Sequence, residues 1–247
     1  DFSIRFYGTG SGGIDRIRIP LLSPSNRAVN IGSDMTIEFW LKASLADNPD
    51  PDTCTTANDS WTNGHVIIDR DIFGDGDFGD YGISLMTGKI AFGVNNGTIG
   101  ATVCGSTDVA DNSWHHIAVV RSNTGQMRIY VDGTLDGTNN SSVTGDISYN
   151  PDRITNMAYP MDPYLIFGAE KHDYDPAYPS YSGFLDSVRF SDIVRYSSNF
   201  TAPTAPHSVD SNTVGLYQFN EGPSGNCATS TEIFDSSGAE NGPSNGE

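Results

Sequence analysis

Apolar and polar residues alternate along much of the chain, which is the pattern of β-strands with one buried face. The clearest example comprises residues 116–121 and 126–132, two runs rich in β-branched residues and separated by a short turn. In the second run Met127, Ile129 and Val131 occupy every other position, so one face of the predicted strand is apolar. The Asp-Gly pair that closes this run is typical of a tight hairpin turn, because both residue types tolerate positive φ angles. The stretch therefore predicts an antiparallel meander.

The same alternation recurs at short intervals and predicts an all-β chain. Further strands are expected at residues 2–6, 14–19, 35–42, 66–69, 81–86, 89–94, 99–104, 164–169, 183–190 and 214–220. The turns between them are rich in glycine, proline, asparagine and serine, as is usual between short strands. A chain of 247 residues is long enough for one large β-sandwich.

Several motifs resemble one known family. Residues 114–121 (Trp-His-His-Ile-Ala-Val-Val-Arg) and 128–136 (Arg-Ile-Tyr-Val-Asp-Gly-Thr-Leu-Asp) are similar to the central hairpin of laminin-G-like domains in the concanavalin A-like lectin/glucanase superfamily. Residues 34–42 (Asp-Met-Thr-Ile-Glu-Phe-Trp-Leu-Lys) and 183–190 (Gly-Phe-Leu-Asp-Ser-Val-Arg-Phe) resemble an early and a late strand of that family. The resemblance implies a jelly roll, a two-sheet antiparallel β-sandwich of roughly 12 to 15 strands. It also implies a short helical turn within residues 191–200.

The chain is expected to be organised as one domain. Residues 1–240 are predicted to form a single laminin-G-like sandwich, and residues 241–247 a tail or linker. Residues 47–64 and 170–182 lack periodicity and are expected to be long surface loops, which in compact domains often carry function. Because residue 1 lies within a strand-like pattern, we expect a mature or excised module that accompanies other domains of a parent protein.

The chain is strongly acidic, with 31 Asp and Glu against 13 Lys and Arg and a formal net charge of −18. Such a field repels nucleic acid and anionic membrane surfaces and attracts cations. No apolar run in the sequence is long enough to cross a bilayer. We therefore expect neither nucleic-acid binding nor membrane insertion. The charge itself has two interpretations, which are solubility or adaptation to salt and a specific role in handling cations.

One acidic run favours calcium as a cofactor. Residues 69–80 combine closely spaced aspartates with glycines. Calcium takes about six to eight oxygen ligands from carboxylates and main-chain carbonyls, and glycine lets carbonyls turn inward. The candidate ligands are Asp71, Asp75, Asp77 and Asp80. The alternative interpretation is a solvated acidic turn.

The family resemblance implies a second calcium site. Many folds of the superfamily hold a structural calcium with an aspartate of the late strand, which corresponds to Asp186 here. Asp15 is expected to lie close to it, after the glycine-rich turn of residues 8–13. The alternative is that Asp186 caps a turn or pairs with Arg189 or Arg16.

The three cysteines lie at positions 54, 104 and 227 and form no Cys-x-x-Cys motif, so a zinc site is not expected. Cys54 falls in a polar insertion and Cys104 at the end of a predicted strand. We expect a disulfide between these two that staples the loop of an exported protein, with reduced cysteines as the alternative. Cys227 is then left free or paired outside this chain.

The sequence argues against an enzyme. Glucanases of the superfamily carry a Glu-x-Asp-x-(x)-Glu pattern on one strand, because retaining hydrolysis needs two carboxyl groups about 5–5.5 Å apart. No two glutamates of this chain share a predicted strand. The pair His115-His116 precedes a strand and is more typical of packed structural residues than of catalysis, since no nucleophile lies beside it in the sequence.

Carbohydrate binding is the function that the residue types favour. Sugars stack on aromatic rings and bond to Asp, Asn and His, and the two long loops contain these types. The candidate ligand-binding residues are Trp61, His172, Asp173, Tyr174, Asp175, Tyr178 and Tyr181. We therefore expect a non-catalytic, calcium-stabilised module, extracellular or at the cell surface, that binds a glycan or another cell-surface ligand. The alternatives are a ligand-free spacer of an adhesin or phage tail, and an accessory module of a glycoside hydrolase.

Overall fold

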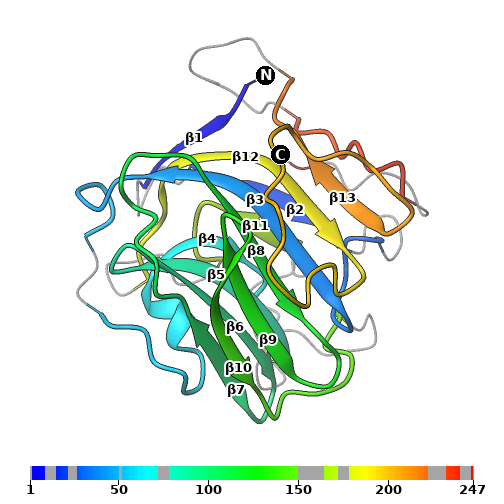
Figure 1. Ribbon diagram of the computed structural model, residues 1–247. Coiled ribbons are helices and arrows are strands. Elements are labelled where there is room, and N and C mark those ends of the chain that lie inside the picture. The colour runs from blue at the N-terminus through cyan, green and yellow to red at the C-terminus, as the bar shows by residue number, and fades with distance from the viewer. Residues whose placement is uncertain are drawn as a thin grey trace.

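Two antiparallel sheets form a sandwich in the computed structural model (Figure 1), so the predicted all-β jelly roll is confirmed. The structure describes residues 2–8, 15–21, 27–49, 52–71, 78–149, 164–171, 178–221, 232–239 and 246. These residues contain 13 strands and a single short 3₁₀ helix. No helix in this part of the chain is long and apolar enough to span a bilayer.

Sheet A is assembled from segments that are distant in the sequence. Its order is β1 (Ile4–Tyr7), β12 (Ser182–Ser191), β3 (Met35–Ala43), β8 (His115–Arg121), β9 (Gln126–Val131) and β10 (Thr134–Asn140), with β13 (Thr213–Tyr217) paired to β12. The pairs β12–β3 and β3–β8 are both antiparallel. A strand from the C-terminal half of the chain therefore lies directly beside an N-terminal strand at the middle of the sheet.

Sheet B lies opposite and follows a simpler path. Its order is β2 (Ile17–Pro20), β11 (Tyr164–Phe167), β4 (His65–Asp69), β5 (Phe78–Met86), β6 (Lys89–Asn96) and β7 (Gly100–Cys104). The last four strands form a meander in sequence order, as the regular spacing of the apolar runs predicts.

Two hairpins are closed by two-residue turns with positive φ angles, and the sequence predicts one of them from its Asp-Gly pair. Thr87 and Gly88, between β5 and β6, have φ angles of 49° and 81°. Asp132 and Gly133, between β9 and β10, have φ angles of 50° and 79°. Positive φ at both central positions matches the right-handed twist of the flanking strands. These tight turns fix the register of both hairpins.

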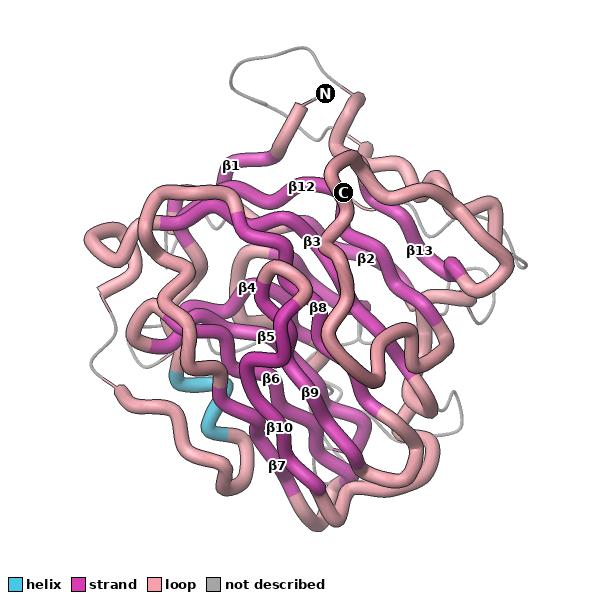
Figure 2. The backbone as a smooth tube through the Cα atoms, viewed as in Figure 1, coloured by secondary structure: helices cyan, strands magenta, loops and turns pink. Residues whose placement is uncertain are grey.

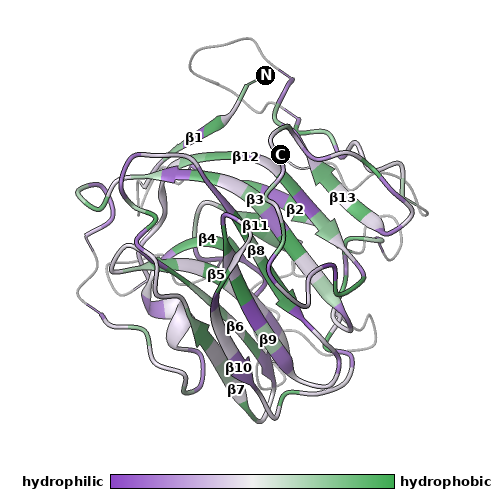
Figure 3. Ribbon diagram, viewed as in Figure 1, coloured by the Kyte–Doolittle hydropathy of each residue, from purple (hydrophilic) through white to green (hydrophobic). Residues whose placement is uncertain are grey.

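The core lies between the two sheets and is built from the inward positions of each strand. Ile37, Phe39 and Leu41 of β3 are fully buried there, as their alternation predicts. In Figure 3 hydrophobic and hydrophilic residues alternate along several of the strands. The residues between the inward positions of β3 therefore point to the outer face of sheet A.

Residues 192–212, named here the cover segment, lie over this outer face (Figure 1). Tyr196 and Phe200 of the cover segment pack on Tyr130 of β9, with their own rings stacked at a centroid distance of 3.6 Å. The segment consists of bends and extended chain, so the helical turn that the family resemblance implies for residues 191–200 is wrong. Its side chains cover Ala118 and Val120 of β8 and Tyr130 of β9, which are therefore buried although they lie on the outer face.

The insertion of residues 47–64 contains the only helix among the described residues, η1 (Ser60–Asn63), drawn in cyan in Figure 2. Cys54 and Cys104 form a disulfide, which is the expected pairing, and it fastens this insertion to the end of β7. Trp61 lies buried over sheet B because Gly82 and Gly93 leave room for its ring. A Cβ atom at either glycine would approach the indole to within 2 Å.

Candidate functional site

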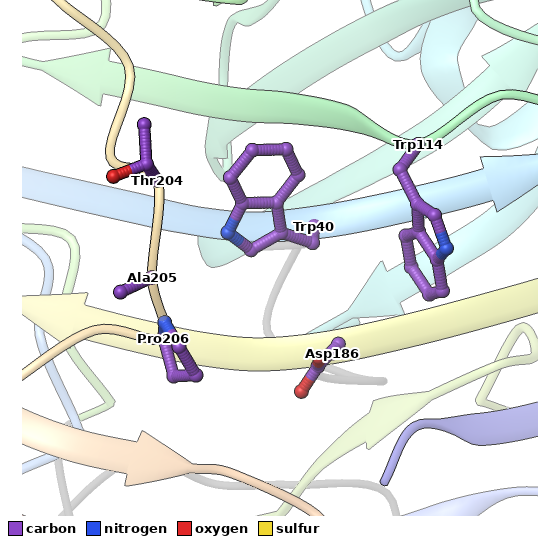
Figure 4. A pocket seen from close by; sticks show the side chains of 6 residues that line it. All are labelled: Trp40, Trp114, Asp186, Thr204, Ala205 and Pro206. Atoms are coloured by element: carbon purple, nitrogen blue, oxygen red, sulfur yellow. The ribbon is translucent and has the colours of Figure 1, made fainter. Parts of the chain in front are cut away.

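A shallow pocket of about 240 Å³ opens on the outer face of sheet A. Its lining consists of Trp40, Trp114, Asp186, Thr204, Ala205 and Pro206 (Figure 4). Figure 4 shows Trp40 and Asp186 between Trp114 on one side and the chain of residues 204–206 on the other. The pocket therefore has a floor on the sheet, one wall from the residue before β8 and one wall from the cover segment.

Strand alternation places both floor residues on the outer face. Trp40 lies between two inward residues of β3, and Asp186 follows the fully buried Leu185 on β12. The register of the sheet sets Trp40 opposite Asp186 on one side and opposite His116 on the other. The edge of the Trp40 ring system meets the His116 ring at a centroid distance of 5.4 Å. The indole is thus positioned by its neighbours on the sheet.

Trp114 forms the first wall and is the more accessible of the two indoles. It immediately precedes β8, is 40% exposed and contacts the ring of Phe184 at a centroid distance of 6.2 Å. A large aromatic side chain that is this exposed beside a pocket is a common feature of ligand sites.

A β-bulge in β12 connects the floor to the second wall. The pairing of β12 with β3 shifts register between Asp186 and Arg189, and Ser187 has a φ angle of 49°. The Ser187 hydroxyl accepts a hydrogen bond from the main-chain N–H of His207, at 2.8 Å. His207 follows Pro206 directly, so the bulge holds the cover segment at the point where it lines the pocket. Bulges are frequent beside functional sites because they re-aim side chains.

A buried charge network lies under the cover segment. Glu38 of β3 accepts hydrogen bonds from Arg189 Nη2 at 2.7 Å and from the Tyr196 hydroxyl at 2.9 Å. Burial by itself raises the pKa of Glu38, but His116, His207 and Arg189 outweigh it and lower the pKa to about 2. Glu38 is therefore a carboxylate at every physiological pH, and it binds the cover segment to the sheet.

This network also contains the only group of three potential metal ligands within the described ranges, namely Glu38, His116 and His207. The distances from the Glu38 carboxylate to the Nε2 atoms of His116 and His207 are 3.4 and 3.9 Å. The same carboxylate lies 2.7 Å from Arg189 and 3.7 Å from Arg195, whose guanidinium groups already offset its charge. A divalent cation would add further positive charge to a buried and balanced site, which is unfavourable. We assign the cluster as a structural network.

The acidic run proposed for calcium is described only at its two ends. Asp71 follows β4, and Asp80 is buried within β5. Asp75 and Asp77 lie outside the described residues. Neither Asp71 nor Asp80 joins a group of three potential ligands in the part of the chain that the structure covers. Calcium in this run stays a prediction.

The two aspartates of the second calcium candidate, Asp15 and Asp186, lie in different environments. Asp15 accepts a hydrogen bond from the main-chain N–H of Tyr7. Asp186 lines the pocket, where burial raises its pKa to about 6 although the N–H of Ser187 acts in the opposite direction. The described residues do not bring these two aspartates into a group of three or more potential ligands. The structure therefore shows Asp186 as a residue of the pocket, and its role as a calcium ligand stays a prediction.

Two of the residues predicted to bind a ligand are buried instead. Trp61 is 1% exposed under the insertion, and Tyr181 is fully buried with its hydroxyl donating to the carbonyl of Phe184. Neither ring offers a free face to a sugar in this structure, and a binding role for either residue stays a prediction. Tyr178 is half-buried. His172, Asp173, Tyr174 and Asp175 lie outside the described residues.

Sequence reasoning missed Trp40, Trp114 and the wall at residues 204–206. Alternation within residues 35–42 does contain a signal for Trp40, because three inward apolar residues leave the tryptophan on the opposite face. The remaining lining comes from elements that meet only through the long-range pairing of β12 with β3.

The chain matches the laminin G model that is described as the concanavalin A-like lectin/glucanases superfamily, over residues 18–198. The chain belongs to this superfamily. The match begins within β2 and ends within the cover segment, so it includes Trp40, Trp114 and Asp186 but not residues 204–206 of the pocket. No curated protein matches the chain.

Solved structures share the fold of this superfamily member at low sequence identity. A putative carbohydrate binding protein from Bacteroides ovatus has 12% identity and a TM-score of 0.55, and the match covers 98% of this chain and 58% of that one. The heptameric SAP-like pentraxin from Limulus polyphemus has 17% identity and a TM-score of 0.51, with 78% and 77% covered. The CBM40 of the Ruminococcus gnavus IT-sialidase, bound to alpha2,3 sialyllactose, has 11% identity and a TM-score of 0.50, with 80% and 92% covered.

Proposed function

We propose that this protein is a non-catalytic carbohydrate-binding module whose site is the pocket of Trp40, Trp114 and Asp186. One observation carries the proposal: two indole side chains and a carboxylate converge on one open pocket. Indole faces pack against the C–H faces of pyranose rings, and carboxylates accept hydrogen bonds from sugar hydroxyls. The pocket's volume of about 240 Å³ and its open side favour the end of a glycan chain or one of its side branches.

Fold relatives support the class of ligand. The Bacteroides ovatus protein is described as carbohydrate binding, and the Ruminococcus gnavus module was solved with a sialylated glycan. Both are less than 15% identical to this chain, so they support carbohydrate binding in general and no particular sugar.

The lining of the pocket supports a binding role over a hydrolytic one. Asp186 is the only carboxyl group among the six residues that line it. Glycoside hydrolysis ordinarily uses two carboxyl groups, one on each side of the scissile bond. A single carboxylate beside two indoles suits recognition.

The setting that we propose is extracellular or at the cell surface, within a larger protein and with a calcium-stabilised fold. The disulfide between Cys54 and Cys104 supports an oxidising compartment, where such bonds persist. The acidic run that contains Asp71 and Asp80 remains our candidate for calcium.

A glycan array with the purified chain tests this function, with Trp114→Ala as the pocket variant. Trp114 is partly exposed, so its removal leaves the fold intact, and we expect signal on the array to fall at least tenfold. Phe234→Ala is the matched control, because Phe234 is 49% exposed and does not line the pocket. Equal binding by both variants and the parent chain would place the site elsewhere. The absence of any glycan signal for the parent chain would favour a ligand-free spacer.

A further inference from the structure

The charge of the pocket lining comes from a single residue. Asp186 is the only charged side chain in its lining, and the other five residues are two tryptophans, a threonine, an alanine and a proline. The outer face of sheet A also carries Arg5 and Lys42, but neither lines the pocket. The guanidinium of Arg5 lies over the ring of Phe184 and 3.9 Å from the carboxylate of Asp47. A ligand in the pocket therefore meets one negative charge and no protein cation from the lining.

We propose that the pocket recognises an amino sugar, with the protonated amine placed against the Asp186 carboxylate and the pyranose ring packed on Trp40 and Trp114. The proposal rests on the proposed function and names the ligand class for the same site. It follows from the lining: a carboxylate beside aromatic faces is complementary to a cation and repels an anion.

Three physical terms favour the amine. The ammonium pairs with a half-buried carboxylate, where a charged hydrogen bond is stronger than at a fully exposed site. It also lies within reach of indole faces, which attract cations through their quadrupole. The net charge of −18 raises the local concentration of cationic ligands around the whole molecule.

The state of Asp186 supports the same assignment. Burial raises its pKa to about 6, because the carboxylate is partly desolvated and the N–H of Ser187 compensates only in part. An ammonium group in the pocket would stabilise the Asp186 carboxylate, which burial disfavours. An N-acetylated sugar has no charge to offer there, and a sialylated sugar would bring a second carboxylate.

Calorimetric titration with three classes of saccharide tests the proposal. The probes are a β-1,4-linked glucosamine oligomer, its fully N-acetylated counterpart and alpha2,3 sialyllactose, all at neutral pH and moderate salt. We expect the glucosamine oligomer to bind at least about tenfold more tightly than either of the others, which corresponds to one charge-assisted hydrogen bond.

Two variants distinguish the effect of Asp186 in the pocket from the effect of the protein's overall negative charge. Asp186→Asn should remove the preference for the amine, with at least about a tenfold loss for the glucosamine oligomer and little change for the N-acetylated one. Asp47→Asn removes one negative charge outside the pocket lining and should leave the preference unchanged. A melting curve for each variant confirms that it is folded.

The outcomes distinguish this inference from the function on which it rests. Equal or tighter binding of the N-acetylated or sialylated probe by the parent chain overturns the amino-sugar assignment but leaves carbohydrate binding standing. An amine preference that survives Asp186→Asn and falls with Asp47→Asn also overturns the assignment, because the preference then arises from negative charge on the protein surface outside the pocket. Failure of every saccharide to bind overturns both.

Discussion

The hydroxyl of Ser187 accepts a hydrogen bond from the main-chain N–H of His207 at 2.8 Å, and this contact ties the β-bulge of β12 to the cover segment. Asp186, which directly precedes Ser187, lies on the floor of the pocket. Pro206, which directly precedes His207, lies in its wall. One hydrogen bond thus sets the distance between the two sides of the pocket.

Replacing Ser187 by alanine should therefore weaken both the fold and the pocket. The buried N–H of His207 would lose its acceptor, which costs about 1 to 2 kcal/mol of unfolding free energy. Ser187→Gly should recover part of this loss, because glycine adopts the positive φ of 49° without strain. Urea unfolding measures both values, and an alanine variant as stable as the parent chain would contradict the role of the hydroxyl.

Glu38 is expected to be the residue on which the cover segment depends most. Glu38→Gln leaves the mostly buried guanidinium of Arg189 without its charged partner, and breaking such a pair around a fully buried carboxylate costs about 3 kcal/mol. Asp210→Asn is the matched control, because it removes a carboxylate from Arg195 at the exposed edge of the same network and should cost less than about 1 kcal/mol. Similar losses for the two variants would contradict the assigned role of Glu38.

Acid should loosen the cover segment through His207. Burial lowers the pKa of His207 to about 4, and Arg189, Arg195 and His116 act in the same direction, whereas Glu38 opposes them. The folded state therefore holds His207 neutral in a range where the unfolded chain, with a pKa near 6.5, is protonated. The contribution of neutral His207 to the free energy of unfolding is fully present above pH 6.5 and is lost as the pH falls from about 6.5 to about 4.

The measurement is the free energy of unfolding of the parent chain and of His207→Gln between pH 7 and pH 4. The parent chain should lose up to about 3 kcal/mol more than the variant over this range, since each pKa unit corresponds to about 1.4 kcal/mol. Parallel pH profiles for the two proteins would show that His207 titrates normally and does not report on the cover segment.

Reduction of the disulfide should destabilise the fold without abolishing binding. The bond joins positions 50 residues apart, and closing a loop of that length in the unfolded chain is worth up to about 4 kcal/mol. Cys54 and Cys104 hold the insertion to β7 of sheet B, whereas the pocket lies on sheet A. A Cys54→Ser, Cys104→Ser double variant should show a lower melting temperature and an unchanged dissociation constant at 20 °C, measured with the same saccharide. A large loss of affinity in the folded variant would place the ligand near the insertion.

The local part of this architecture is predictable from the sequence, and the pocket is not. The alternation of Ile37, Phe39 and Leu41 specifies a strand and its buried face, and the Asp132-Gly133 pair specifies a turn, because both depend on residues within a few positions. The disulfide also follows from local context, since Cys54 is in a polar loop and Cys104 at a strand end.

Long-range packing accounts for the parts that the sequence did not reveal. Trp61 resembles a sugar-stacking residue in a polar loop, and only the position of Gly82 and Gly93 beneath it makes the ring a buried one. Asp186 and Trp40 become neighbours only through the pairing of β12 with β3, and the bulge at Ser187 has no signal in the local pattern. Such features depend on contacts between distant segments.

The amino-sugar assignment makes a prediction about pH that uses a ligand of constant charge. A glucosamine oligomer whose amines are trimethylated remains cationic at every pH. It has no N–H to donate, but it keeps the ionic attraction to Asp186 and to the indole faces, so any change in its affinity with pH reports on the protein. Asp186, with a pKa of about 6, is mostly ionised at pH 7 and mostly protonated at pH 5. Affinity should therefore rise with pH and fall about tenfold between pH 7 and pH 5, in proportion to the ionised fraction.

Asp186→Asn supplies the control, because its side chain carries no charge over this range and its affinity should not change with pH. His207 also begins to take up a proton in the acidic part of the range, because burial and the neighbouring groups Glu38, Arg189, His116 and Arg195 set its pKa at about 4. Its effect on affinity would appear in the variant as well. The difference between the two pH profiles thus isolates Asp186. Identical profiles for the parent chain and the variant would remove Asp186 from the site, even if the pocket binds sugar.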